Sequence, residues 1–125
     1  MSEKYFTVEE ANRLVPDLLE EIPRLQTLFS VLNTKFPDIK KARKQTNLNG
    51  GSLEGEAYLK VALEVNRRVK ELEEKGCILK GVEQGLVDFL ALREGKEIYL
   101  CWRAPEKEIR FWHDLDAGFA GRQPI

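Results

Sequence analysis

Apolar residues in the first third of the chain recur at alternating steps of three and four. They are Ala11, Val15, Leu18, Ile22, Leu25, Phe29, Leu32, Phe36 and Ile39. This spacing keeps one face of a helix apolar, as in the seam between two packed helices. Thr7 and Glu10 have the spacing of a capping box, and Phe6 is placed to pack on the first turn. The pattern therefore predicts a long helix that begins directly after Thr7.

Two prolines, Pro16 and Pro23, fall within this helical pattern, seven residues apart. The spacing places both beside the seam on the outer surface, where water can satisfy the carbonyl groups that lose a hydrogen bond. We therefore expect two bends, and a sharper one at Pro37. A basic run at 40–44 and a segment of loop composition at 46–52 then predict a reversal of the chain.

A second helical pattern starts near Leu53 to Glu56 and stops at Gly76, a natural left-handed cap. Its seam consists of Tyr58, Ala62, Val65, Val69 and Leu72. Residues 1–76 therefore predict a long antiparallel helical hairpin with a loop near 45–56. Further apolar residues flank the two seams, namely Leu14, Leu19, Leu28, Leu59 and Val61. Because a two-helix contact leaves these residues uncovered, we expect a homodimer joined at least partly through the helices.

After Gly76 the apolar residues alternate with polar ones, which is the period of a β-strand. Strands are predicted at 77–80, 86–92 and 96–103, and the turn at Glu94 and Gly95 joins the last two. A two-residue turn fixes the register of the strands that it connects. The predicted facing pairs are Ala91 with Ile98, Phe89 with Leu100, Val87 with Trp102, and Asp88 with Cys101.

A turn centred on Pro105 and Glu106 leads into another predicted strand. We expect this strand to place Ile109, Phe111 and His113 on the apolar face of the sheet, beside Trp102, Leu100 and Ile98 respectively. The opposite face is then predicted to hold Asp88, Tyr99, Cys101, Arg103, Arg110 and Trp112. The fold class is α+β, with the helical hairpin followed by a small antiparallel β-meander packed on it. Residues 1–125 form one domain, in which 77–125 supply the meander and a carboxyl-terminal tail.

Composition narrows the classes of function. The 125 residues are 42% hydrophobic, enough for one core, and 20 Lys and Arg nearly balance 21 Asp and Glu. A balanced charge disfavours nucleic-acid binding, and the basic run at 40–44 suits the carboxyl end of a helix. No apolar run approaches the roughly 20 residues of a membrane span, and no signal-peptide core is present. We expect a cytoplasmic protein without a membrane partner.

Motifs of catalysis are absent from the sequence. Cys77 and Cys101 are isolated, with no second Cys or His at metal-ligand spacing, so both are expected to be reduced, packed thiols. The chain has no phosphate-binding loop, nucleophile elbow or paired metal-ligand helix. No cofactor is expected on these grounds.

Asp88 is the most informative single residue, because it interrupts an otherwise apolar strand. A buried carboxylate must find a partner, change its pKa or serve a purpose. Arg103 and Arg110 are predicted to flank it, which is most simply an ion pair that registers the strands. The alternative is a pocket for an anion or carboxylate, in which both arginines bind the ligand and Tyr99 and Trp112 form the floor.

The sequence contains one histidine, His113, followed closely by Asp114 and Asp116. These three side chains could bind a divalent metal, or the histidine could carry a proton. A lone histidine at a strand end is more often a packing residue. The divalent metal therefore stays an open alternative to the absence of a cofactor.

Five strings spread over nearly the whole chain carry a resemblance to a known family. They are 5–12, 85–89, 100–103, 112–113 and 118–124. In these strings the chain resembles an uncharacterised prokaryotic family, domain-of-unknown-function family 2203. The resemblance implies a small protein with a long amino-terminal helical region and no established activity. Any family function would fall on the matched positions Asp88, Cys101, Trp102, Arg103, Glu106, His113, Gly118, Gly121 and Arg122.

The chain departs from the family pattern at three places. Lys80-Gly81 stands where members tend to have Lys-Asp, Leu90 where Pro tends to follow Phe, and Pro105-Glu106 where a Gly-Glu turn is usual. The first departure removes an acidic side chain, because Gly81 stands where members tend to have Asp. This argues against a metal site formed by that acid together with Asp88.

Two classes of function follow. The first is a dimeric, non-catalytic assembly or interaction protein built on the helical hairpin, and the seam together with the missing catalytic motifs favours it. The second is a small-anion-binding or metal-binding protein or enzyme, with a site around Asp88, Arg103, Arg110 and His113. Whether the protein is an enzyme stays open. The two classes differ in whether Asp88 pairs only with arginine or faces an open pocket.

Overall fold

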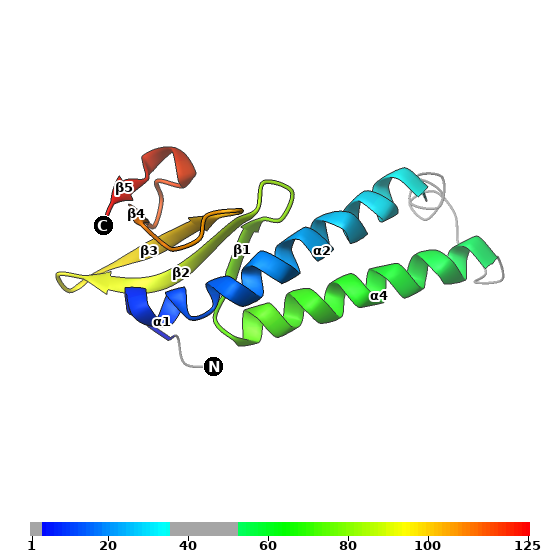
Figure 1. Cartoon of the computed structure of the whole chain (residues 1–125), viewed down its shortest axis with the longest axis horizontal. Helices are drawn as coiled ribbons and strands as arrows, with labels where there is room; N and C mark the ends of the chain where they lie inside the picture. Colours follow the sequence, from blue (N-terminus) through cyan, green and yellow to red (C-terminus); the bar gives the residue numbers. More distant parts are fainter. Residues whose placement is uncertain (1–3, 36–52) are drawn as a thin grey trace.

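The computed structural model describes residues 4–35 and 53–125, and it has an α+β fold in which helices precede an antiparallel sheet (Figure 1). The predicted α+β class, with helices followed by an antiparallel sheet, is therefore confirmed. The helices project to one side of the sheet, and the carboxyl-terminal segment lies at the far side of it (Figure 1). Pro37 and the predicted loop at 46–52 lie outside the described residues, as do the seam positions Phe36 and Ile39.

The first predicted helix is two helices, α1 (Val8–Asn12) and α2 (Val15–Lys35). Thr7 and Glu10 form the predicted capping box, in which the Thr7 hydroxyl accepts from the Glu10 amide at 3.0 Å. A two-residue turn after Asn12 separates the helices, so the prediction of one continuous helix was wrong. Pro16 lies in the first turn of α2, where a missing N–H costs little. It therefore begins a helix instead of bending one, whereas Pro23 lies inside α2.

The helix α4 (Leu53–Glu74) starts within the predicted range. It ends at Glu74, and Gly76 caps it with a φ of +101°, the left-handed conformation predicted for this glycine. The Cys77 amide donates to the Leu72 carbonyl at 3.1 Å. The helices α2 and α4 lie side by side (Figure 1). Arg68 of α4 pairs with Glu21 of α2 at 2.8 Å, and Lys75, directly after α4, pairs with Asp17 of α2 at 3.4 Å.

Five antiparallel strands form the sheet in sequential order. They are β1 (Ile78–Gly81), β2 (Leu86–Arg93), β3 (Lys96–Arg103), β4 (Phe111–Asp114) and β5 (Gln123–Pro124). A short 3-10 helix, η1 (Phe119–Gly121), precedes β5. Every predicted pair between β2 and β3 is confirmed, including Asp88 opposite Cys101.

The predicted register between β3 and β4 was wrong by one residue. Tyr99 faces His113, Leu100 faces Trp112, and Cys101 faces Phe111. A shift of one residue exchanges the two faces of a strand. His113 and Phe111 therefore lie on the same face as Asp88, and Trp112 lies on the apolar face. Arg110 precedes β4 and therefore does not flank Asp88, contrary to the prediction.

One hydrophobic core joins the helices to the apolar face of the sheet. The helices contribute five buried seam residues from Ala11 to Leu25, and α4 contributes Val65 and Leu72. The sheet contributes Val87, Phe89, Ala91, Ile98, Leu100 and Trp102. Among the described residues, no helix is both long and apolar enough to cross a membrane. The core occupies one face of the sheet, and the carboxyl-terminal tail lies against the other face, which carries Asp88.

Candidate functional site

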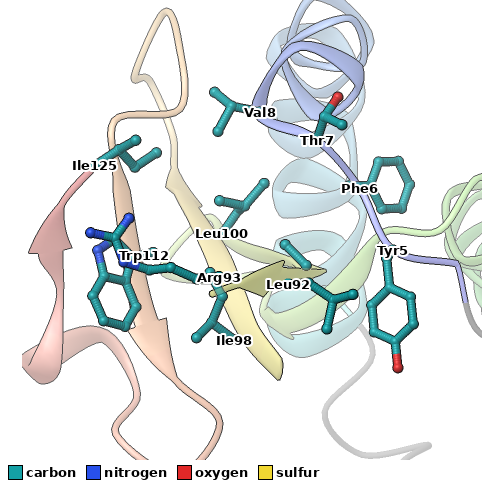
Figure 2. Close-up of a pocket in the computed structure, with 11 residues that line it drawn as sticks. Tyr5, Phe6, Thr7, Val8, Leu92, Arg93, Ile98, Leu100, Trp112 and Ile125 are labelled. Atoms are coloured by element: carbon teal, nitrogen blue, oxygen red, sulfur yellow. The ribbon is translucent and has the colours of Figure 1, made fainter. Parts of the chain in front are cut away.

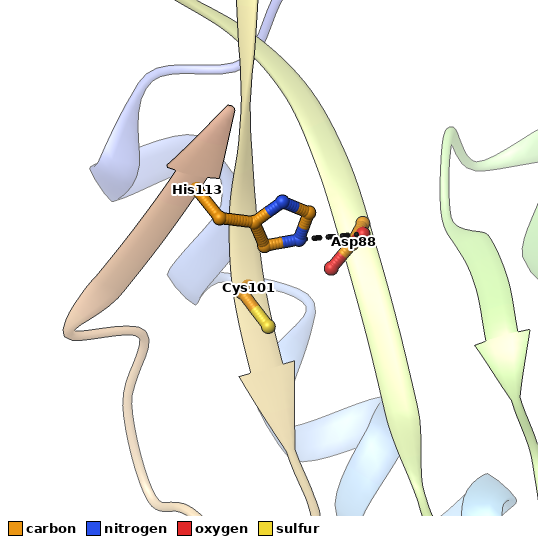
Figure 3. Close-up of side chains that lie close together, drawn as sticks. All are labelled: Asp88, Cys101 and His113. Atoms are coloured by element: carbon orange, nitrogen blue, oxygen red, sulfur yellow. Dashed lines mark hydrogen bonds and ion pairs between the residues drawn. The ribbon is translucent and has the colours of Figure 1, made fainter. Parts of the chain in front are cut away.

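Asp88 lies in the middle of β2 and is 2% exposed. Its partner is His113 of β4, whose Nε2 lies 3.0 Å from the Asp88 Oδ2 atom (Figure 3). Neither arginine that was expected to flank the acid does so: Arg103 lies over the Phe119 ring at 5.2 Å, and Arg110 pairs with Glu108 at 2.6 Å. The buried acid therefore pairs with a titratable imidazole.

The protonation of this pair follows from the second imidazole nitrogen. His113 Nδ1 lies 2.7 Å from the main-chain carbonyl oxygen of Asp114. A carbonyl only accepts, so Nδ1 carries a hydrogen and donates it. Nε2 then faces a carboxylate oxygen, and two acceptors cannot lie 3.0 Å apart in a buried site without a cation between them. That cation is a proton in the metal-free chain, and a metal ion can take its place.

Burial raises the pKa of Asp88 above its ordinary value of 3.8, while His113, Cys101 and Lys80 act in the opposite direction. The direction is upward because the surrounding sheet and tail remove water from the carboxylate. Asp88 therefore holds a proton more readily than an exposed aspartate does.

Cys101 is the third member of the cluster, directly across from Asp88 on β3 and 1% exposed. Burial raises the pKa of its thiol to about 12, assisted by the negative charge of Asp88. The thiol is therefore protonated at neutral pH. His113 cannot activate it, because both imidazole nitrogens already have other partners. This geometry excludes a cysteine nucleophile of the Cys-His type in this arrangement.

Three different donor atoms converge at this point. The ligand atoms of Asp88, Cys101 and His113 lie within 4.8 Å of one another, and no other group of this kind occurs in the described parts of the chain. Figure 3 shows that Asp88 and His113 reach toward each other from the strands on either side of β3, with the Cys101 sulfur close by. We define these three residues as the Asp-Cys-His cluster.

A cavity of about 210 Å³ borders the cluster. It is lined by the three cluster residues together with Lys80, Leu86, Leu115, Asp116, Gly118 and Phe119. The Lys80 ammonium lies 4.4 Å from the centre of the Tyr99 ring, which itself contacts the His113 ring edge-on at 5.6 Å. A small molecule in the cavity would therefore meet the cluster, one cation and apolar walls.

The carboxyl-terminal tail forms the outer wall of this cavity, and Arg122 holds the tail in place. Its Nη2 donates to Glu106 at 2.7 Å and to the Cys101 carbonyl at 3.1 Å. The guanidinium also lies over the Phe111 and Phe119 rings, at 4.2 and 4.7 Å. Three of the family-motif positions thus act together in positioning the cavity wall.

Glu106 also orders the connection between β3 and β4. Its side chain accepts from the Arg103 amide at 2.6 Å, and its main-chain carbonyl accepts from the Trp102 indole at 2.7 Å. The roles of Glu106 and Trp102 are therefore structural in this geometry. Gly118 and Gly121 belong to the tail, where Gly118 has a φ of +68° and lines the cavity.

The other residues that the sequence suggested for the site do not all lie on the Asp88 face of the sheet. The Asp114 carboxylate pairs with Lys96 at 3.1 Å and only the Asp114 carbonyl touches the cluster, whereas Asp116 lines the cavity. Trp112 lies on the opposite face, away from Asp88. Sequence reasoning missed Lys80 and Phe119 as cavity walls. The alternation of residues 109–113 predicted a strand, but the predicted register placed His113 on the apolar face of the sheet instead of the Asp88 face.

The fold and the site together define an α+β protein with a buried Asp, Cys and His cluster beside a small cavity. The chain belongs to the family of uncharacterized conserved proteins DUF2203, which matches residues 4–125. Neither a comparison with curated proteins nor one with solved structures found a match. The family resemblance of the sequence is confirmed, and it assigns no activity to the cluster.

Proposed function

We propose that the protein is a metal-dependent small-ligand-binding protein or enzyme, in which Asp88, Cys101 and His113 bind one divalent transition metal. The observation that carries this proposal is the convergence of three buried donor atoms within 4.8 Å. Tetrahedral zinc, with bonds of about 2.0–2.3 Å, needs ligand atoms roughly 3.3–3.8 Å apart. Small side-chain adjustments therefore suffice to coordinate the ion.

The mixture of oxygen, sulfur and nitrogen donors favours zinc over magnesium or calcium, which prefer oxygen alone. The Asp114 carbonyl supports this assignment, because it fixes the imidazole so that Nε2 is the nitrogen available to the metal. Three protein ligands beside a cavity are typical of zinc sites that keep one position open for water or substrate.

A small anion is the ligand that suits the open position. Lys80 is the cationic side chain among the residues that line the cavity, and its charge acts on Asp88. With the metal it would supply two positive centres to a carboxylate or phosphate group. Asp88 is not paired with arginine and borders a cavity, which supports a site over a purely structural ion pair.

The direct experiment is native mass spectrometry with elemental analysis of protein purified without chelator. One zinc per chain is expected, and Asp88→Asn and His113→Asn should each abolish it. Asp114→Asn is the matched control, because its carboxylate pairs with Lys96 and its carbonyl is unchanged. A metal-free wild type that takes up no zinc at micromolar concentrations would overturn the proposal.

The cysteine ligand has its own spectroscopic test. Cobalt bound in place of zinc should give a thiolate-to-metal charge-transfer band in the near ultraviolet, which Cys101→Ser removes. Cys77→Ala is the control, since Cys77 is buried in the hydrophobic core and is not one of the three converging donors. A band that survives Cys101→Ser would exclude Cys101 as a ligand.

A second candidate function, assembly as a homodimer through the helices, has an observation in its favour. Leu59 and Leu63 stand one turn apart on α4 and are 49% and 60% exposed, and Leu19 of α2 is 36% exposed. We propose that α2 and α4 form a hairpin whose outer face pairs with a second copy. Light scattering at micromolar concentration should give a dimer that Leu59→Lys with Leu63→Lys converts to a monomer, whereas Lys60→Gln leaves it intact. A wild-type monomer would contradict this candidate.

A cytoplasmic location is part of the proposal. Both cysteines are free and buried. Free thiols are usual in compartments that keep cysteine reduced. Fractionation of cells that express the protein would test the assignment, and recovery with the membrane or the medium would contradict it.

A further inference from the structure

A second cavity, of about 420 Å³, lies on the opposite face of the sheet from the Asp-Cys-His cluster. Figure 2 shows it between the ends of β3 and β4 and the segment that precedes α1. Its walls are formed by Tyr5, Phe6, Thr7, Val8, Ala91, Leu92, Arg93, Ile98, Leu100, Trp112 and Ile125. A cavity of this size falls within the range of small-molecule sites, roughly 300–1,000 Å³.

The walls are held in place by the fold and not by a ligand. The Phe6 amide donates to the Leu90 carbonyl at 2.7 Å, which fixes the amino-terminal segment beside β2. Ile98 and Leu100 are 3% and 4% exposed and form the floor. The apolar surface is therefore present before any ligand arrives, which lowers the entropic cost of binding.

Arg93 is the charged side chain among the residues that line this cavity. Its guanidinium lies 4.7 Å from the centre of the Trp112 ring, and within the described residues it has no carboxylate partner. The Trp112 Nε1 atom is buried and has no acceptor in that same part of the chain. Two hydrogen-bond donors thus lie together at one side of an apolar cavity, without an acceptor.

We propose that this cavity binds a small amphipathic carboxylate, whose alkyl body packs against Phe6, Ile98 and Leu100 and whose carboxylate pairs with Arg93. A guanidinium matches the geometry of a carboxylate, so the two groups can form two parallel hydrogen bonds. A neutral or cationic head group gains nothing from Arg93. The site is independent of the proposed metal, because the two lie on opposite faces of the sheet.

Octanoate is the probe that tests this proposal, with octanol and octylammonium as neutral and cationic analogues. Titration should give saturable octanoate binding that is about tenfold or more tighter than that of octanol, since a hydrogen bond to a charged group is lost in octanol. Octylammonium should not bind. Arg93→Gln should reduce the octanoate affinity to that of octanol, and the exposed Arg24→Gln should leave it unchanged.

Amide and indole NMR of the wild type gives a second readout that needs no variant. Octanoate should shift the Trp112 indole resonance and leave that of Trp102, which already donates to Glu106, in place. Equal affinities for octanoate and octanol, or an unshifted Trp112 indole, would overturn the proposal. So would a concentration-dependent shift of that resonance without ligand, because it would place a second copy in the cavity.

Discussion

The Nε2 atom of His113 lies 3.0 Å from the Oδ2 atom of Asp88, across the intervening strand β3, and both side chains are 3% exposed. Because Nδ1 donates to a carbonyl, the contact holds one proton in the metal-free chain. The metal ion that we propose would displace this proton, so its binding would depend on pH.

Metal binding should release about two protons per chain at neutral pH. One is the proton between His113 and Asp88, and the other is the Cys101 thiol proton, which the pKa of about 12 retains in the metal-free chain. Zinc affinity should therefore rise with pH. Calorimetric titrations in buffers of different ionisation enthalpy measure the number released.

Cys101→Ser separates the two protons, since serine has no acidic proton to lose in this range. The variant should bind zinc more weakly and release about one proton. Release of two protons from this variant would show that the second proton comes from a group outside the cluster.

Stability of the metal-free chain should depend on pH through Asp88. Its pKa is raised in the folded chain above 3.8, so protonation favours folding. The stabilisation from protonated Asp88 is complete below about pH 3.8 and is lost as the pH rises through the raised pKa of the folded chain. Urea denaturation with chelator should show wild-type stability falling relative to Asp88→Asn over this interval. Asp114→Asn, whose carboxylate is outside the cluster, should parallel the wild type, and a constant difference for Asp88→Asn would contradict the prediction.

Arg122→Ala should destabilise the fold by about 1.5–3 kcal/mol, because Glu106 loses a hydrogen bond from a charged group that is only 12% exposed. It should also weaken zinc binding, since the tail that lines the cavity is released. Urea denaturation and zinc titration measure the two effects. Arg110→Ala is the matched control: its side chain is 72% exposed, and the change should stay within about 0.5 kcal/mol.

Gly76→Ala should destabilise the chain more than Gly95→Ala. Both glycines have positive φ, +101° and +80°, so both substitutions bring backbone strain of about 1–3 kcal/mol. A Cβ at Gly76 would also lie 2.5 Å from the Phe6 ring, whereas one at Gly95 would meet no atom within 4 Å. Thermal denaturation of the two variants measures the difference, and equal losses would show that Phe6 moves aside freely.

The sequence predicted the β2–β3 pairing residue for residue because two residues, Glu94 and Gly95, close the turn. Glu94 has a φ of +54° and Gly95 a φ of +80°, the backbone of a turn that matches strand twist. Such a turn leaves no freedom in the register, so Asp88 had to face Cys101. This half of the candidate cluster followed from the sequence alone.

The β3–β4 pairing was not predictable in the same way. Seven residues, 104–110, separate the two strands, and this length does not select a register. Tertiary contacts select it instead, such as the Asn12 side chain that accepts from the Ile109 amide at 2.7 Å. The one-residue difference in register places His113 beside Asp88. The contact that defines the site therefore could not be predicted from local sequence patterns.

The break between α1 and α2 was hidden for a different reason. Ala11 and Val15 keep the seam spacing on both sides of the turn, so hydrophobic periodicity passes through it without a signal. Pro16 marked the position, and its preference for the first turn of a helix was the clue. Periodicity reports which residues are buried more reliably than it reports where a helix is interrupted.

The hydrogen bond from the Phe6 amide to the Leu90 carbonyl covers part of the edge of β2. β1 pairs with β2 only as far as Asp88, so the segment around Phe6 shields the main chain of β2 beyond that point. Removal of the chain up to and including Phe6 would expose a strand edge to which other chains can add, and would therefore favour aggregation.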